Sequence, residues 1–194
     1  ASAVRGCHLE PLLTSTPVPT PSCSWAVVKY QALGALVITA SHNPPEWLGL
    51  KIKGPYGSSV DADFTESVER RILAGGITIP INVNTERFDG RKDHLEGLQN
   101  QIDLLSLTNG IKQIGLKVIV DPMHGSAAGC IPELLSELGE NLVTEIHSSR
   151  DPLFGGNPPE PLEPYLHDLI QAVKVSALSG QPSIGLVFDG DGDR

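Results

Sequence analysis

The sequence has few cysteines, few basic residues and no long apolar run, and each shortage argues against a class of protein. Three cysteines, Cys7, Cys23 and Cys130, are odd in number and lack a C-x-x-C spacing, so we expect reduced, buried thiols in a cytoplasmic protein. Lysine and arginine total 14 against 23 acidic residues, and the net charge of −9 argues against nucleic acid and anionic membranes as partners. No signal peptide or run of membrane-spanning length is present, so no membrane partner is expected.

The remaining composition is that of an ordinary globular protein. With 194 residues, of which 40% are hydrophobic and 19% charged, the chain can bury a core in one or two domains. Because it begins at Ala1 and stops on an acidic motif at Arg194, we expect a fragment of a longer protein.

Two strand ends carry the residues with evident chemistry. The apolar run at 35–38, preceded by Gly34, predicts a buried strand that delivers Ser41 to a loop within T-A-S-H-N-P at 39–44. The apolar run at 184–188 leads directly into D-G-D-G-D-R at 189–194. Ligands bind at such strand ends in open α/β sheets. A serine at one end and three alternating aspartates at another indicate a phosphate-carrying hydroxyl facing a divalent metal.

The first half of the chain predicts mixed local structure. Prolines at 17, 19 and 21 exclude a helix there, and residues 1–21 are expected to be irregular. A helix over 23–33, capped by Ser22, and a second strand over 50–53 follow. Asp61 or Asp63 is expected to cap a further helix that ends at Gly75–Gly76 and carries the apolar stripe Phe64, Val68 and Ile72.

The second half predicts alternating strands and helices. Residues 77–92 are expected to be a connection, followed by one helix with the apolar stripe Leu95, Leu98, Ile102 and Leu105. A polar turn at Thr108-Asn109-Gly110 would separate domains 1–107 and 108–194. Strands over 117–120, 142–146 and 184–188 alternate with helices over 128–138 and 163–177. This order predicts a parallel sheet with right-handed crossovers.

The chain resembles the α-D-phosphohexomutases, the phosphoglucomutase/phosphomannomutase superfamily. The resemblance rests on T-A-S-H-N-P at 39–44, on Gly49-Leu50-Lys51, and on D-G-D-G-D-R at 189–194, in that order. It implies two mixed or parallel-sheet α/β domains of phosphohexomutase type, both incomplete. Residues 1–107 would be the C-terminal part of domain I, with the phosphoserine loop, and 108–194 would be domain II. The downstream domains of the same enzyme are then missing partners, and the chain alone is expected to be inactive.

The resemblance also implies a reaction. Phosphate would move reversibly between the 1- and 6-positions of a hexose, glucose in the first place and mannose in the second. Phosphoserine 41 would donate to the free hydroxyl, a hexose 1,6-bisphosphate would turn round in the site, and the other phosphate would return to the serine. The substrate is a phosphorylated hexose, and the cofactor is Mg²⁺.

Roles follow for individual residues. Ser41 would carry the phosphate and help to ligate the metal. His42 and Lys51 would be further catalytic residues, and Lys53 is the spare candidate, that is, an alternative to Lys51 for the same role. Asn43 and Arg194 would contact phosphate. The metal ligands would be Asp189, Asp191 and Asp193. Carboxylate oxygens suit Mg²⁺, and without a cation these charges would repel a phosphoserine dianion.

Other interpretations stay open. Within the family, the chain could be a phosphoglucosamine mutase. Outside it, an aspartate-nucleophile phosphatase or phosphotransferase and a non-catalytic module that binds calcium or another divalent metal are the alternatives, although Arg194 stands where an EF-hand loop has glycine. One residue departs from the family pattern: Leu48 replaces the asparagine that many relatives have before Gly49. Separately, the backbone amides of the 121–126 loop are expected to help to position a ligand.

Overall fold

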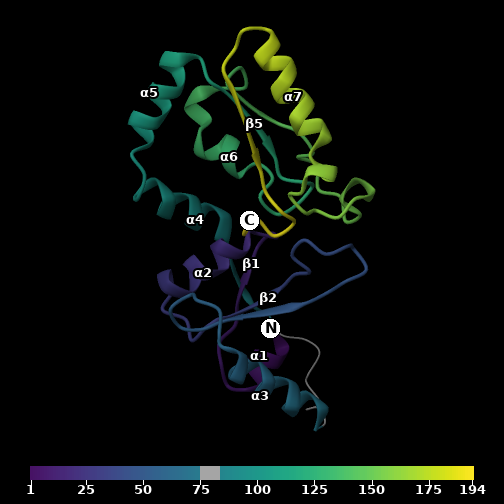
Figure 1. The fold of residues 1–194 in the computed structure, drawn as a ribbon. Coiled ribbons are helices and arrows are strands. Elements are labelled where there is room, and N and C mark those ends of the chain that lie inside the picture. The colour runs from purple at the N-terminus through teal and green to yellow at the C-terminus, as the bar shows by residue number, and fades with distance from the viewer. Residues whose placement is uncertain (75–83) are drawn as a thin grey trace.

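The computed structural model of the chain describes residues 1–74 and 84–194. Figure 1 shows two halves, with the C-terminus between them. The first half contains α1 (Ser2–Gly6), β1 (Leu12–Thr14), α2 (Thr20–Lys29), β2 (Ala35–Ile38), β3 (Leu50–Lys53), α3 (Ala62–Leu73) and β4 (Glu86–Phe88). The second half follows with α4 (Gly90–Gln99), α5 (Leu104–Ile114), β5 (Lys117–Asp121), α6 (Cys130–Leu134), η1 (Ser136–Leu138), β6 (Val143–Glu145), η2 (Phe154–Gly156), η3 (Glu163–Tyr165), α7 (His167–Leu178) and β7 (Ser183–Val187). No helix in the described ranges is long and apolar enough to cross a membrane.

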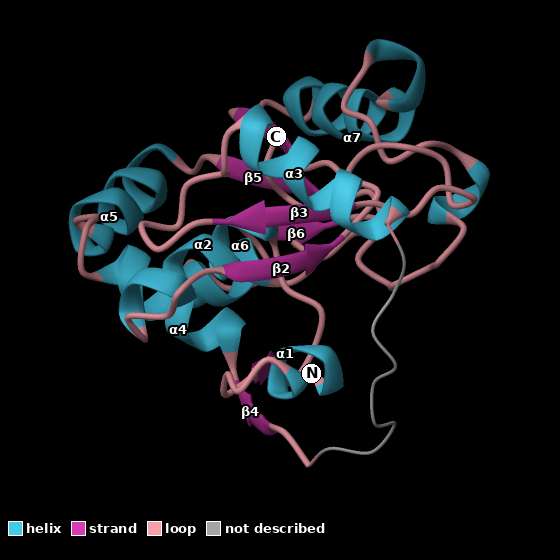
Figure 2. Cartoon of the chain, turned by 90° about the horizontal axis from the view of Figure 1, so that it is seen from below, coloured by secondary structure: helices cyan, strands magenta, loops and turns pink. Residues whose placement is uncertain are grey.

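The strands predicted at 35–38 and 50–53 are confirmed as the antiparallel pair β2 and β3, which lie side by side in Figure 2. Val37 lies opposite Lys51, and paired backbone hydrogen bonds of 3.0 Å between Thr39 and Gly49 extend the ladder. Residues directly opposite one another share a face, and side chains alternate along a strand. The register therefore places Val37, Thr39 and Lys51 on one face of this ribbon.

The expectation that β2 is buried is wrong for its other face. Val37 is 8% exposed, whereas Leu36 and Ile38 are 57% and 72% exposed. The ribbon has only two strands, and α2 packs on the Val37 side. Among the described residues, no helix or strand covers the other side in the same way, so the apolar run is half-buried.

Residues 1–21 are not irregular throughout. They contain α1 and β1, and β1 pairs in parallel with β4, with Leu12 opposite Glu86. β4 lies in the stretch expected to be a connection. Pairing between strands more than 70 residues apart leaves no local signal in either, and this is why both short strands were missed.

Helix α2 begins earlier than predicted, at Thr20, and ends at Lys29. Its N-cap is Pro19, with no capping side chain, and the second helical position is a proline, whose fixed φ suits the first turn. The expectation that Ser22 caps this helix is wrong. Ser22 lies buried inside the helix, with its Oγ 2.9 Å from His94 Nδ1.

Helix α3 is capped by Asp61, one of the two predicted caps, whose carboxylate accepts a 2.8 Å hydrogen bond from the Phe64 amide. The predicted end at Gly75–Gly76 lies outside the described residues. The expected apolar stripe contributes little to the core, because Phe64 is 49% and Ile72 68% exposed.

The single helix expected from Leu95 to Leu105 is two helices, α4 and α5. The carboxylate of Asp103 caps α5 by accepting a 3.0 Å hydrogen bond from the Ser106 amide. The predicted polar turn at 108–110 is also wrong, because it lies inside α5, where Thr108 Oγ1 donates to the Leu104 carbonyl at 2.8 Å. The division of the chain at 107/108 stays a prediction.

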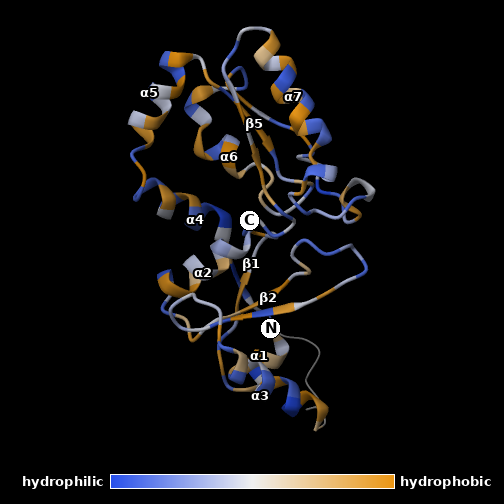
Figure 3. Ribbon diagram, in the orientation of Figure 1, coloured by the Kyte–Doolittle hydropathy of each residue, from blue (hydrophilic) through white to orange (hydrophobic). Residues whose placement is uncertain are grey.

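The predicted parallel sheet is confirmed, with the order β6-β5-β7. Figure 1 places α5 and α6 on one side of it and α7 on the other. In Figure 3, α5 and α7 alternate between hydrophobic and hydrophilic residues, as expected of helices with one face on a sheet. The two predicted helices are each interrupted, as α6 with η1 and η3 with α7. The core is formed by Ile111, Val118, Val120, Leu135, Leu138 and Val143.

Helices α2 and α4 join the two halves. The carboxylate of Asp93 accepts hydrogen bonds of 2.6 Å from Lys29 Nζ and from the Tyr30 hydroxyl. Gly97 lies directly against the indole of Trp25, and a Cβ at this position would be 2.5 Å from two ring carbons. The close approach of the helices therefore depends on glycine at this position.

We expect Gly97→Ala to destabilise the protein and Gly110→Ala to stabilise it. Alanine in a helix gains about 1 kcal/mol over glycine, but at Gly97 the overlap with Trp25 costs about 1–3 kcal/mol. Gly110, in α5, has no atom within 4 Å of an added Cβ. Urea unfolding of both variants measures the difference. Equal and stabilising effects would show that α2 and α4 do not pack this closely.

Candidate active site

Ser41 lies in a tight turn at the end of β2. Its φ is +54°, a left-handed conformation that is uncommon for a residue other than glycine. The turn is held by the Ser41 amide, which donates to Thr39 Oγ1 at 2.8 Å, and by the Asn43 amide, which donates to the Ala40 carbonyl at 3.0 Å. Such strain persists where the surroundings impose it, commonly at functional sites. Here it presents the serine hydroxyl outward from the strand end.

Residues 189–194, here called the acidic loop, follow β7 and fold back on themselves. Asp189 is 0% exposed, and its Oδ1 accepts hydrogen bonds from the amides of Asp193 and Arg194 at 3.0 and 3.3 Å. Gly190 faces the Ser41 turn so closely that a Cβ would lie 2.6 Å from the Ser41 carbonyl oxygen. The glycine therefore allows the two loops to touch.

The two strand ends meet at the hydroxyl of Ser41. This group is 3.2 Å from Asp189 Oδ2 and 3.3 Å from Asp191 Oδ1, across 148 and 150 residues of sequence. One ligand atom from each of Asp189, Asp191 and Asp193 lies within 4.8 Å of the others. The residues with the most evident chemistry in the sequence thus form one cluster between the two halves.

Lys51 neutralises part of this negative charge. Its ammonium lies 2.8 Å from Asp191 Oδ2 and 2.6 Å from Asp193 Oδ2. Burial alone would lower the pKa of Lys51, but the hydrogen bonds with the two carboxylates raise it above its ordinary value. Lys53, the spare candidate, donates instead to Ser59 Oγ at 3.2 Å.

The two buried aspartates differ in their electrostatics. Burial raises the pKa of Asp189, and the negative charge of Asp191 adds to this effect. Burial also opposes ionisation of Asp191, yet hydrogen bonds from Lys51, Thr20 and Thr39 lower its pKa. The site therefore holds more negative charge than its single lysine balances, as expected of a cation site.

Three further residues at this cluster were not among the predicted site residues. Thr20 Oγ1 donates to Asp191 Oδ2 at 2.7 Å, and Thr39 Oγ1 donates to the same oxygen at 3.0 Å. Glu160 Oε1 lies 3.7 Å from His42 Nε2 and 3.8 Å from Arg194 Nη1. Thr39 stands in the quoted T-A-S-H-N-P motif, but no local pattern marks Thr20 or Glu160.

The remaining predicted site residues surround the Ser41 hydroxyl less closely. His42 Nδ1 is 3.5 Å from Ser41 Oγ. The side-chain amide of Asn43 donates to the Ala40 carbonyl at 3.0 Å and so supports the turn. The guanidinium of Arg194 is about half exposed. The structure thus brings His42 to the hydroxyl and leaves Arg194 partly free at the edge.

A family model described as phosphoglucomutase/phosphomannomutase, alpha/beta/alpha domain II, matches residues 92–194, more than half of the chain. The chain belongs to this family. The model for domain I of the same family matches residues 5–76. Both parts of the cluster, the Ser41 turn and the acidic loop, lie in matched segments.

Similar proteins carry names from this family. A phosphoglucomutase/phosphomannomutase from Thermococcus kodakarensis is 34% identical, over 91% of this chain and 37% of that protein. A phosphoglucosamine mutase from Methanococcus vannielii is 31% identical, over 91% of this chain and 38% of that protein. The solved structure of parafusin, a phosphoglucomutase from Paramecium, shares the fold with a TM-score of 0.82 at 21% identity, over 95% of this chain and 39% of that one. The chain thus spans less than two fifths of the length of these relatives.

The aspartates of this mutase-family chain fit a hard divalent cation. All candidate ligands are carboxylate oxygens, and the two most buried aspartates each direct one oxygen at Ser41. Oxygen ligands of this kind suit Mg²⁺, which commonly shares its ligand shell with a phosphate. A cation here would also offset the like charges that raise the pKa of Asp189.

The 121–126 loop of this family member supports the acidic loop and does not offer free amides. The Ser126 amide donates to the Gly190 carbonyl at 3.0 Å, and the amides of Met123, His124 and Gly125 are bonded within the protein. The expectation that these amides position a ligand is therefore wrong. The ring of His124 bonds to the Ser149 carbonyl at 2.8 Å, which fits a structural role.

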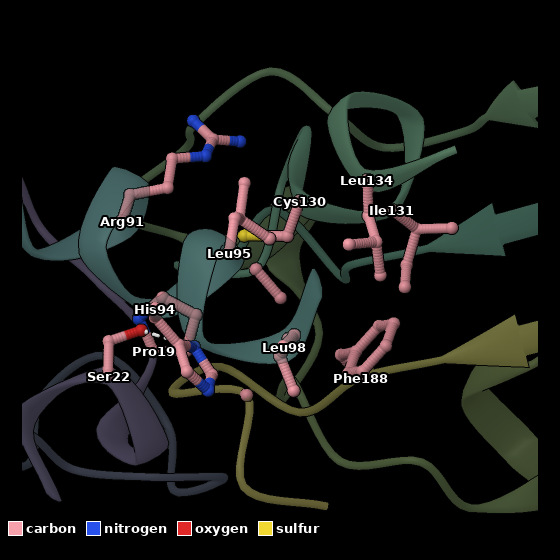
Figure 4. A pocket seen from close by; sticks show the side chains of 12 residues that line it. Pro19, Ser22, Arg91, His94, Leu95, Leu98, Cys130, Ile131, Leu134 and Phe188 are labelled. Atoms are coloured by element: carbon pink, nitrogen blue, oxygen red, sulfur yellow. Dashed lines mark hydrogen bonds between the residues drawn. The ribbon is translucent and has the colours of Figure 1, made fainter. Parts of the chain in front are cut away.

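A small cavity lies behind the acidic loop of this mutase-family chain, between α4 and α6 (Figure 4). Its volume is about 90 Å³ and its lining is largely apolar, whereas ligand pockets for small molecules usually measure about 300–1,000 Å³. Cys130 lies in its wall. Burial raises the pKa of the Cys130 and Cys23 thiols, whereas Cys7 is exposed, so the expectation of buried thiols is wrong for Cys7. The cavity is a packing gap between the halves and is too small for a hexose phosphate.

Proposed function

We propose that the protein carrying this chain is a phosphohexomutase that moves phosphate reversibly between the 1- and 6-positions of a hexose. The observation that carries the proposal is the convergence of Ser41 with Asp189 and Asp191 at 3.2 and 3.3 Å. A serine hydroxyl beside two buried carboxylates and a lysine is suited to carry a phosphoryl group next to a cation. Relatives named as phosphomutases support the same reaction.

In this proposal, the transfer breaks the bond between phosphorus and Ser41 Oγ and forms a bond to a sugar hydroxyl oxygen, whose proton passes to a base. His42 Nδ1, 3.5 Å from Ser41 Oγ, is the group we assign to hold that proton. Lys51 is the charge stabiliser, because its raised pKa keeps it positive. Mg²⁺, held by Asp189, Asp191 and Asp193, supplies neutralisation of phosphoryl charge when bound.

The rest of the proposal concerns the phosphate contacts and the context of the site. Asn43 and Arg194 bind phosphate, with Glu160 orienting the arginine. A hexose 1,6-bisphosphate is the intermediate that must turn round between the two transfers. Because the relatives are more than twice as long as this chain, we propose that further domains of the same enzyme complete the sugar site. Action in the cytoplasm is part of the same proposal.

Glucose phosphate is the proposed substrate, with mannose phosphate second and glucosamine phosphate as the alternative. A coupled assay on the intact protein, with Mg²⁺ and each of the three hexose 1-phosphates, tests this directly. The rates identify the sugar. Absence of turnover on all three, with Ca²⁺ bound in preference to Mg²⁺, would replace the proposal with a calcium-binding module. An acid-labile phosphate on an aspartate would indicate an aspartate-nucleophile phosphotransferase instead.

A further inference from the structure

The two most buried aspartates of the acidic loop share one arrangement. In each, one carboxylate oxygen is bound to protein donors and the other faces the Ser41 hydroxyl. Asp189 Oδ1 is held by two backbone amides, and its Oδ2 faces Ser41. In Asp191 the atom names are exchanged: Oδ2 is bound to protein donors, and Oδ1 faces Ser41.

The two aspartates are held by different kinds of donor. The amides that bind Asp189 belong to the acidic loop itself. Asp191 Oδ2 accepts from side chains that come from elsewhere in the chain, namely the hydroxyls of Thr20 and Thr39 and the ammonium of Lys51, at 2.7, 3.0 and 2.8 Å. A carboxylate oxygen has about two lone pairs, and three donors leave none free. Asp191 can therefore offer a cation only Oδ1.

Thr20 is the most specific of these donors. Thr20 is 2% exposed, it lies 171 residues before Asp191, and its amide also donates to the Asp191 carbonyl at 2.8 Å. Although Thr20 begins α2, that helix has no side-chain cap, so the hydroxyl does not serve the helix end. Thr39, by contrast, also accepts a hydrogen bond from the Ser41 amide and belongs to the serine turn.

We propose that Thr20 is a positioning residue which, together with Thr39, restricts Asp191 to one ligand oxygen and thereby makes the site favour Mg²⁺ over Ca²⁺. Mg²⁺ requires a compact octahedral shell, whereas Ca²⁺ takes six to eight oxygens and readily accepts both oxygens of one carboxylate. A carboxylate locked in one orientation suits the first ion and penalises the second. The inference rests on the proposed function, because the cation site belongs to it.

The test compares Thr20→Val, which keeps the shape and removes the hydroxyl, with Thr20→Ser, which keeps the hydroxyl. Titration calorimetry on the intact protein without sugar gives Kd for MgCl₂ and CaCl₂. Residues that orient metal ligands typically contribute 10–100-fold to affinity, so we expect Thr20→Val to weaken Mg²⁺ binding by about 10-fold. Ca²⁺ binding should fall less, because Asp191 without Thr20 is held less firmly in one orientation and Ca²⁺ tolerates a more flexible ligand shell than Mg²⁺ does. Thr20→Ser should restore the wild-type ratio.

Thr108→Val is the matched control. Thr108 is 3% exposed and donates its hydroxyl to the Leu104 carbonyl inside α5, so its loss removes a buried hydrogen bond away from the site. We expect this variant to keep the wild-type ratio of the two Kd values. An unchanged ratio in Thr20→Val, with Mg²⁺ still bound, would overturn the role proposed for Thr20 and would leave the proposed function unaffected. Absence of divalent-cation binding in the wild type would overturn the cation site of the proposed function as well.

Discussion

Replacement of Ser41 by alanine is expected to abolish mutase turnover. The hydroxyl is the group that the site presents to both buried aspartates, and without it no covalent phosphoenzyme can form. Loss of a catalytic nucleophile lowers turnover on the order of 10⁴-fold or more. The coupled assay with Mg²⁺ and glucose 1-phosphate measures this loss. Mass spectrometry of the wild type should find acid-stable phosphate on Ser41 and none on the variant.

Ser58→Ala provides the matched control, because Ser58 is an exposed serine in the turn that follows β3, in the same half of the molecule. This variant should keep wild-type turnover. Turnover by Ser41→Ala at the control rate would show that the phosphate is carried elsewhere. Phosphate on an aspartate of the acidic loop would then be the first alternative to examine.

Asp189→Asn is expected to remove most Mg²⁺ binding while leaving the acidic loop folded. The asparagine carbonyl can still accept from the amides of Asp193 and Arg194, as Oδ1 does now. The charged oxygen facing Ser41 becomes an amide that cannot ligate a cation. Because burial and like charge raise the pKa of Asp189, the change also relieves repulsion in the metal-free protein.

Thermal unfolding with and without MgCl₂ measures this effect. A ligand at 100 times its Kd stabilises the folded state by about 2.7 kcal/mol, and we expect Asp189→Asn to lose this increment. Asp121→Asn is the control, since Asp121 is 1% exposed at the end of β5 and pairs with His147 at 3.0 Å. It should lower stability but keep the Mg²⁺ increment. Retention of the full increment by Asp189→Asn would show that Mg²⁺ binds elsewhere.

The sequence predicted the elements whose signals are local. Apolar runs predicted β2, β5 and β7, a short strand was also predicted at 50–53, where β3 lies, and the order of strands and helices after residue 116 predicted a parallel sheet. The cap at Asp61 was readable because capping depends on residues three positions apart. The break between α4 and α5 was missed, although Asp103 has the same capping spacing, because the apolar stripe continues across it.

Identity of the main site residues was also available from the sequence. A serine after one strand and alternating aspartates after another, in family order, indicated the phosphate carrier and the metal ligands before any geometry was known. Their roles stay predictions, but their proximity is now observed, with Ser41, Lys51 and the three aspartates in one cluster.

Tertiary structure alone decided what holds that cluster in place. Thr20 reaches Asp191 across 171 residues, and Glu160 lies between His42 and Arg194. It also decided that one face of β2 is exposed and that β1 pairs with β4. Periodicity and capping report interactions within a few residues, whereas these features depend on segments that lie far apart in the chain. The sequence by itself therefore predicted which groups form the site, and the packing determined which of their atoms are held by protein donors and which face Ser41.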